Sequence, residues 1–235
     1  MKQIANVFTA LLVLLLVSCN NKPKETAETP VADTTKPVAV VPVFTPYKAM
    51  IIQHTVKDFD KWMTAFNGHD SIRKVNGFTD ASVGRGLDND KLVVVYNVIG
   101  DLAKAKDFSA SANLKEVMKK AGVNSAPSIS FVEVIRDDTT TIPQQERIMV
   151  THHVKDFDAW LKVYDSEGLA ARAANGMVDR GMTRSLDDPN TVSLLFAITD
   201  MAKVKARLAS PEMKKVMTDA GVDGPPQITF FKWMN

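Results

Sequence analysis

The sequence predicts an α+β protein built from two tandem copies of one domain with the element order βαββαβ. Two observations carry this prediction. The second half of the chain repeats the first, and each half switches its hydrophobic period between that of strands and that of helices. The repeat aligns His54 with His152 and continues to Pro127, which aligns with Pro226. Two copies of this length are two domains, not a solenoid.

Each copy begins with an alternating strand, at 50–56 or 148–154, and Asp58 or Asp156 then offers a carboxylate that caps a helix. Apolar side chains recur along this helix at the spacing of a stripe that faces the core. The stripe consists of Phe59, Trp62, Met63 and Phe66 in the first copy and of Phe157, Trp160, Leu161 and Tyr164 in the second.

Each copy continues with two strands, short helices and a final strand. The turns between the two strands, at 88–90 and 187–190, are rich in Asp and Asn. In the second copy Ser210 caps a helix that has Pro211 in its first turn. The preceding helices begin at Asp101 and Asp200, and the last strands span 128–135 and 227–234.

Several strands are apolar on both faces, which indicates that both faces are covered. Because helices cover one face, the sister sheet is the simplest cover for the other. We therefore expect the repeats, 47–136 and 148–235, to pack sheet to sheet within one chain, with 137–147 as a linker.

Three motifs carry a family resemblance: His-x-Val-Lys-Asp-Phe-Asp-x-Trp at His54 and His152, the Asp-Asp-Pro-Asn turn at 187–190, and the ending Ala-Gly-Val-x-x-x-Pro-x-Ile-x-Phe. They resemble the dimeric α+β barrel superfamily, which includes the antibiotic-biosynthesis-monooxygenase-like domains. The resemblance implies ferredoxin-like domains that form an intrachain pseudo-dimeric α+β barrel. That scaffold hosts oxygenases, haem-degrading enzymes, isomerases and proteins with no known reaction, so it does not decide the function.

The N-terminus has the pattern of a signal peptide at 1–18, with an apolar run that is too short for a comfortable membrane span. The stretch that ends in Cys19 resembles the lipobox of bacterial lipoproteins, which implies a cysteine that is acylated and anchors the chain. Residues 19–46 are rich in Pro, Thr, Lys and Glu and predict a disordered tether. An uncleaved anchor or a chance match is the alternative.

The expected location is the bacterial cell envelope, with the membrane as a partner through Cys19. In enteric bacteria an aspartate after this cysteine resembles an inner-membrane retention signal. The chain has Asn20 instead, which favours the outer membrane, facing the periplasm.

Composition excludes several classes of function. Lys+Arg 29 against Asp+Glu 27 gives a net charge of +2, so we expect no nucleic-acid partner. Because Cys19 is the single cysteine, the folded part lacks disulfides, cysteine-ligated metals and cysteine nucleophiles. Metal-ligand spacings, phosphate loops and nucleotide fingerprints are missing, so we expect no metal and no cofactor.

Four recurring residues are candidates for a site. His54 and His152 point to an apolar face, where they act as catalytic bases or ligand-orienting groups, or are buried histidines that hydrogen-bond to the backbone or to each other. Arg85 and Arg184 either bind an anionic group of a ligand or pair with the nearby hairpin. Trp62 and Trp160 lie on the core stripes and are core residues by that spacing.

The copies differ at aligned positions, so the barrel can hold one specialised pocket instead of two, although divergence without selection gives the same pattern. Gly84 aligns with Thr183, Glu133 with Lys232, and Ser125-Ala126 with Gly224-Pro225.

The leading hypothesis is an envelope lipoprotein whose barrel binds or oxidises a small apolar or aromatic molecule in a cavity with few polar groups. The alternative is a non-catalytic envelope protein that has a filled barrel and binds partners on its outside. We expect a monomer, because the tandem copies supply within one chain a pairing that this fold commonly makes between two chains.

Overall fold

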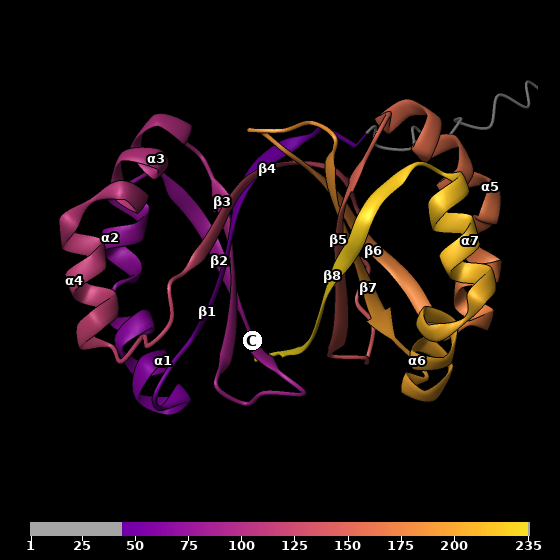
Figure 1. Cartoon of the computed structure of the whole chain (residues 1–235). Coiled ribbons are helices and arrows are strands. Elements are labelled where there is room, and N and C mark those ends of the chain that lie inside the picture. The colour runs from indigo at the N-terminus through magenta and orange to yellow at the C-terminus, as the bar shows by residue number, and fades with distance from the viewer. Residues whose placement is uncertain (1–43, 235) are drawn as a thin grey trace, which may run out of the picture. The chain divides into compact units, whose positions relative to one another are not determined.

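The computed structural model describes residues 44–234, which form a closed barrel of eight strands with helices on its outside (Figure 1). The predicted signal at 1–18, the anchor Cys19 and most of the tether at 19–46 lie outside the described residues. Among the helices of the described part, none is long and apolar enough to cross a membrane.

The two repeats contain the elements that the sequence predicts, in the same order. The first repeat consists of β1 (Tyr47–Thr55), α1 (Phe59–Gly68), α2 (Asp70–Val75), β2 (Phe78–Gly86), β3 (Leu92–Ile99), α3 (Leu102–Ala110), α4 (Ala112–Lys120) and β4 (Ser128–Asp137). The second consists of β5 (Glu146–Val154), α5 (Phe157–Ala174), β6 (Met177–Ser185), β7 (Thr191–Ile198), α6 (Met201–Ala209), α7 (Pro211–Asp219) and β8 (Val222–Trp233). The helix α5 corresponds to α1 and α2 together and is kinked at Gly168, whose φ is 77°.

The helices begin at the predicted capping residues. The Lys61 amide donates to the Asp58 carboxylate at 3.0 Å, and the Ala159 amide donates to Asp156 at 2.8 Å. Asp101, Asp200 and Ser210 cap α3, α6 and α7 in the same way. Each such cap satisfies a backbone N–H that would otherwise lack a partner, which stabilises the helix by about 1 kcal/mol.

The strand β8 begins five residues before its predicted start at 227. The strand β8 begins at Val222, which pairs with Val154, whereas the equivalent part of the first repeat forms only an isolated bridge between Val56 and Val123. The register of β8 shifts next to Thr151, and Gly224, with φ of 80°, takes up the irregularity. The strand therefore begins before the residues that carry its alternating pattern.

The strands form one closed ring in the order β1-β3-β2-β8-β5-β7-β6-β4. The seams between the repeats are antiparallel: β4 pairs with β6 from Val132↔Ser185 to Asp137↔Gly181, and β2 pairs with β8 from Gly84↔Trp233 to Gly86↔Phe231. The predicted fold class is confirmed. The two sheets face each other and also join edge to edge, so the barrel leaves no strand edge unpaired.

Reciprocal contacts show the pseudo-two-fold relation of the repeats. Lys106 on α3 lies 3.7 Å from the Asp187 carboxylate, and its counterpart Lys205 lies 3.9 Å from Asp88. At the seams the Leu186 amide donates to the Phe131 carbonyl, and the Leu87 amide donates to the Phe230 carbonyl. Because the ion pairs are exposed, their contribution to stability is small.

The apolar residues form three layers. One cluster lies between the sheet of each repeat and its helices, and it contains Trp62 in the first repeat and Trp160 in the second, both 4% exposed. The predicted core role of these tryptophans is confirmed. The third cluster lies inside the barrel and takes residues from both repeats, including Val132 and Phe231.

The barrel interior is packed differently at its two seams. Phe231 lies directly against Gly84 of the neighbouring strand, where a Cβ atom would come within 2.3 Å of the Phe231 ring. The equivalent inward residue of the first repeat is Val132, which has a smaller side chain. The Phe231 ring therefore requires a residue without a side chain at position 84, whereas Val132 makes no such demand on its neighbouring strand.

We predict that Gly84→Ala lowers the free energy of unfolding by about 1–3 kcal/mol, because the added methyl overpacks the Phe231 ring. The matched control is Gly181→Ala on β6, where a Cβ atom would meet nothing closer than 3.5 Å. This control should be neutral or slightly stabilising. Urea unfolding of both variants measures the difference, and equal effects would contradict the packing argument.

Candidate functional site

Two cavities are lined by candidate residues, and a third lies inside the barrel. The first, of about 90 Å³, lies between the sheet and the helices of the first repeat and includes His54; we call it the helix-side pocket of repeat 1. Its counterpart in repeat 2 measures about 80 Å³ and includes His152. The third, of about 240 Å³, lies inside the barrel and is called the barrel cavity.

The two histidines occupy equivalent places. His54 is 3% exposed and His152 is 6% exposed, and each ring contacts the tryptophan of its own stripe edge-on, at 5.4 Å between ring centroids. Neither ring has a hydrogen-bond partner on either nitrogen among the described residues. The interpretation of a histidine paired with the backbone or with its counterpart is therefore wrong.

Burial also determines the charge of these imidazoles. It lowers the pKa of His54 and that of His152 to about 4, because the apolar surroundings disfavour the charged form. Both rings are neutral at pH 7 and offer one donor and one acceptor each. A base with so low a pKa is weak, so the geometry suits hydrogen bonding to a ligand better than proton abstraction.

The predicted ligand-binding arginines both reach a hairpin turn. The Arg85 guanidinium donates to the carbonyl and the carboxylate of Asp90, and it lies over the Phe59 ring. Arg184 donates to the Pro189 carbonyl at 2.8 Å in the same manner. Neither arginine lines any of the three cavities. Their role in ligand binding stays a prediction, and their observed contacts brace the hairpins.

An ionic cluster borders the pocket of repeat 2. The Arg172 Nε lies 2.8 Å from the Asp179 carboxylate, which also accepts a hydrogen bond of 2.6 Å from the Tyr164 hydroxyl. Glu167 lies 3.5 Å from Arg172 and 2.5 Å from Arg207. Each charged group of this cluster has an ion-pair partner, although the buried Arg207 Nε has no hydrogen-bond partner among the described residues.

The equivalent place in repeat 1 lacks this cluster. Arg73 corresponds to Arg172 and donates to the Phe66 carbonyl at 2.5 Å, but its carboxylate partner is the exposed Asp70, at 3.3 Å, and its buried Nε has no partner. Burial lowers the pKa of Arg73. In Arg172 burial acts in the same direction, but the hydrogen bonds with Asp179 raise the pKa overall. His69 stands opposite Glu167, Phe108 opposite Arg207, and Phe66 opposite Tyr164.

Asn97 on β3 adds a third unpaired polar group to the helix-side pocket of repeat 1. Its side chain is 2% exposed, and its Oδ1 has no hydrogen-bond partner among the described residues. The residue in the same place on β7 is Phe196, which fills the space with an apolar ring. The two pockets therefore differ in chemistry although they share a fold.

Sequence reasoning missed three residues of this pocket. They are His69, Arg73 and Asn97. The His69 Nδ1 lies 2.6 Å from the Ala65 carbonyl oxygen, and the ring lines the pocket. Nothing in the sequence pattern marks His69. The internal repeat carried a signal for the other two, because Arg73 recurs as Arg172 and Asn97 is replaced by Phe196.

No group of three or more histidine, aspartate or glutamate side chains within residues 44–234 is arranged to hold a metal ion.

Comparison with known proteins supports the fold alone. No protein-family model matches the chain, and no curated protein matches it by sequence. Among solved structures, an anthrone oxidase-like protein superposes with a TM-score of 0.57 at 13% identity, covering 80% of this chain and 92% of that one. The chain has the dimeric α+β barrel fold. A candidate monooxygenase from Lactobacillus acidophilus gives 0.51 at 16% identity, covering 81% and 94%, and a candidate chlorite dismutase gives 0.53 at 13%, covering 81% and 95%. Each of these matches extends over both repeats of this chain.

We predict that acid destabilises the protein through its two buried histidines. The unfolded chain takes up a proton on each imidazole near pH 6.5, whereas the folded chain does so only near pH 4. Stability is therefore lost as the pH falls below 6.5, by about 2 kcal/mol per histidine at pH 5. Urea unfolding at pH 7 and pH 5 should show this loss. His54→Leu and His152→Leu should each remove about half of it, and an unchanged pH dependence in both variants would refute the assignment.

Proposed function

We propose that this protein is a bacterial envelope lipoprotein whose first repeat binds a small, mainly apolar or aromatic molecule in its helix-side pocket. The observation that carries the proposal is the difference between the two repeats. Among the described residues that line the helix-side pocket of repeat 1, His54, Arg73 and Asn97 keep buried polar atoms without partners, whereas among those that line the pocket of repeat 2 only His152 does. An unpaired buried polar group costs about 1–3 kcal/mol, so a ligand that hydrogen-bonds to these atoms would gain from pairing them.

The lining of the pocket suits an aromatic or aliphatic body with one or two polar groups. Trp62 and Phe66 stack at 5.0 Å along one wall, and His54 meets the edge of Trp62. The neutral His54 ring can donate or accept a hydrogen bond, and the Asn97 Oδ1 accepts one. A phenol, an indole or a similar ring with a single N–H or O–H satisfies this pattern.

The pocket must open to admit such a ring. Its volume of about 90 Å³ is smaller than the roughly 150 Å³ cavity known to bind benzene in an engineered protein. The helix α4 contributes no fully buried residue, and Leu114 and Val117 from this helix line the pocket. Because α4 is held by few buried contacts, an outward shift of this helix is the simplest way to enlarge the space.

We predict that indole binds to repeat 1 and that Asn97→Phe, which copies Phe196 of repeat 2, weakens binding at least tenfold. His54→Leu should weaken it as well, because a hydrogen-bonding atom is removed. The matched control is His152→Leu, which makes the same change in the pocket of repeat 2, where Phe196 replaces Asn97, and should leave indole affinity unchanged. Isothermal titration of the full chain in detergent measures the affinities.

A stricter variant transfers the cluster of repeat 2 into repeat 1. The double substitution His69→Glu with Phe108→Arg places a carboxylate and a guanidinium where repeat 2 has Glu167 and Arg207. We expect the variant to fold with the Arg73 charge paired and to lose indole binding. Equal binding in the wild type, in this variant and in Asn97→Phe would reject the pocket as the site.

Oxidation of the bound molecule is part of the proposal because the fold is shared with an anthrone oxidase-like protein. The cofactor-free oxidation of anthrone by dioxygen gives anthraquinone and water. Oxygen uptake with anthrone that is abolished by Asn97→Phe, but not by His152→Leu, would support an enzyme. Binding without oxygen uptake would leave a carrier or sensor.

The lipid anchor is tested separately from the pocket. We predict that the mature chain begins at Cys19 with attached acyl groups and fractionates with the outer membrane. Buried methylene groups contribute about 0.8 kcal/mol each, so several chains give stable anchoring. Cys19→Ser should release the protein from membranes and remove the acyl mass. A wild-type chain that lacks lipid, as measured by mass spectrometry of the intact protein, would disprove the anchor.

A further inference from the structure

The barrel cavity is separate from both helix-side pockets and lies on the inner face of the sheets. It exists because the two repeats fill the barrel unequally. On β8 the inward side chains are Phe231 and Trp233, whereas the equivalent positions on β4 are Val132 and Val134. Val134, Phe231 and Trp233 all line the cavity of about 240 Å³, and Val134 is the smallest of these side chains.

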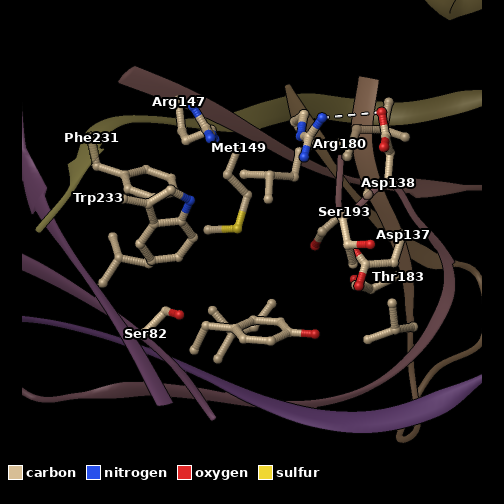
Figure 2. A pocket seen from close by; sticks show the side chains of 18 of the residues that line it. Ser82, Asp137, Asp138, Arg147, Met149, Arg180, Thr183, Ser193, Phe231 and Trp233 are labelled. Carbon is tan, nitrogen blue, oxygen red and sulfur yellow. Dashed lines mark hydrogen bonds and ion pairs between the residues drawn. The ribbon is translucent and has the colours of Figure 1, made fainter. Parts of the chain in front are cut away.

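Two arginines of repeat 2 lie along one side of this cavity (Figure 2). Arg147 on β5 is 8% exposed and Arg180 on β6 is 9% exposed. The equivalent residues of repeat 1 are Ala49 and Ala81, so both charges belong to one copy only. This difference makes the interior of the barrel chemically one-sided.

Only one of these two arginines has a carboxylate partner among the described residues. The Arg147 Nη1 donates to the backbone carbonyls of Gln144 and Glu146, at 2.7 and 3.0 Å, and no carboxylate of the described residues forms an ion pair with it. Arg180 lies 3.1 Å from the Asp138 carboxylate at the exposed rim. The burial of Arg147, together with the charge of Arg180, lowers the pKa of Arg147. A buried cation without a counter-ion is unfavourable, so the site favours an anion.

The remaining carboxylate of the rim is already engaged. Asp137 is exposed and accepts a hydrogen bond of 2.7 Å from the Tyr47 hydroxyl, which in turn accepts one of 3.0 Å from Tyr96. Burial is the main cause that raises the pKa of Tyr47, to about 12, so both phenols stay neutral. Thr183, on the same strand as Arg180, also lines the cavity (Figure 2). Its buried hydroxyl has no partner among the described residues, and its counterpart in repeat 1 is Gly84.

We propose that the barrel cavity binds a small organic monocarboxylate with a flat aromatic body, whose carboxylate pairs with Arg147 and Arg180. The body lies against Met149, Trp233 and Val134, and the Thr183 hydroxyl is free to bind a second polar group of the ligand. One uncompensated guanidinium matches a monoanion better than a phosphate dianion. The volume lies below the roughly 300–1,000 Å³ of pockets for drug-sized ligands, so the ligand has one or two rings.

The test compares 2-naphthoate with the neutral 2-naphthamide of nearly the same shape, and uses benzoate as a smaller probe. Isothermal titration of the full chain in detergent should give saturable naphthoate binding that is at least tenfold tighter than amide binding. Arg147→Met should weaken naphthoate at least tenfold and affect the amide little. Arg136→Met is the matched control, because the Arg136 guanidinium binds Asp165 away from the cavity.

A second variant keeps the charges and removes the space. Val134→Trp copies Trp233 of repeat 2 and should abolish naphthoate binding while both arginines remain, so the proposal stays testable if Arg147→Met does not fold. Asn97→Phe should leave naphthoate binding unchanged, which separates this cavity from the helix-side pocket. Equal affinity for acid and amide would overturn the proposal, and so would binding that Val134→Trp leaves intact, or the absence of binding by both naphthoate and benzoate.

Discussion

Barrel closure is the constraint on which the rest of the structure depends. Each four-stranded sheet is apolar on both faces, and in isolation it would have two unpaired edges. The helices can cover only the outer face. The seams β4–β6 and β2–β8 pair the edges and bring the inner faces together, burying Val132 and Phe231. A single repeat would expose that face and both edges to water, a surface that promotes pairing with other chains.

The fold was predictable because its signals are local or repeated. Asp58 and Asp156 cap the helices that the apolar stripes define. The phase of the first strand placed His54 and His152 on an apolar face, which in the structure is the face that the helices cover. The polar atoms without hydrogen-bond partners in the pocket of repeat 1 were not predictable. Their lack of partners depends on which side chains converge across α2, β1 and β3, and Asn97 looks like any polar residue of a strand until its neighbours are known.

Tandem duplication removes a restriction that a homodimer has. In a homodimer every substitution occurs at two symmetric places, whereas here each repeat changes alone. Repeat 2 pairs Arg172 with Asp179 and Glu167, while in repeat 1 Arg73 stacks on the Phe66 ring at 3.7 Å and has one exposed carboxylate partner. Inside the barrel the two repeats also differ. Both arginines of the barrel cavity, Arg147 and Arg180, come from repeat 2, and repeat 1 has alanine at the equivalent positions.

This division has a consequence for stability. Unpaired buried polar groups cost about 1–3 kcal/mol each, and both repeats hold them: His54, Arg73 and Asn97 in repeat 1, and His152, Thr183 and Arg207 in repeat 2. Repeat 2 pairs the charges of its own cluster and fills the place of Asn97 with Phe196. Because the seams join all eight strands in one ring, the helix-side pocket of repeat 1 cannot collapse without disturbing strands that repeat 2 holds in place. Duplication thus allows the two copies to keep different polar groups available for a ligand, Arg73 and Asn97 on the helix side of repeat 1 and Arg147 and Thr183 of repeat 2 inside the barrel.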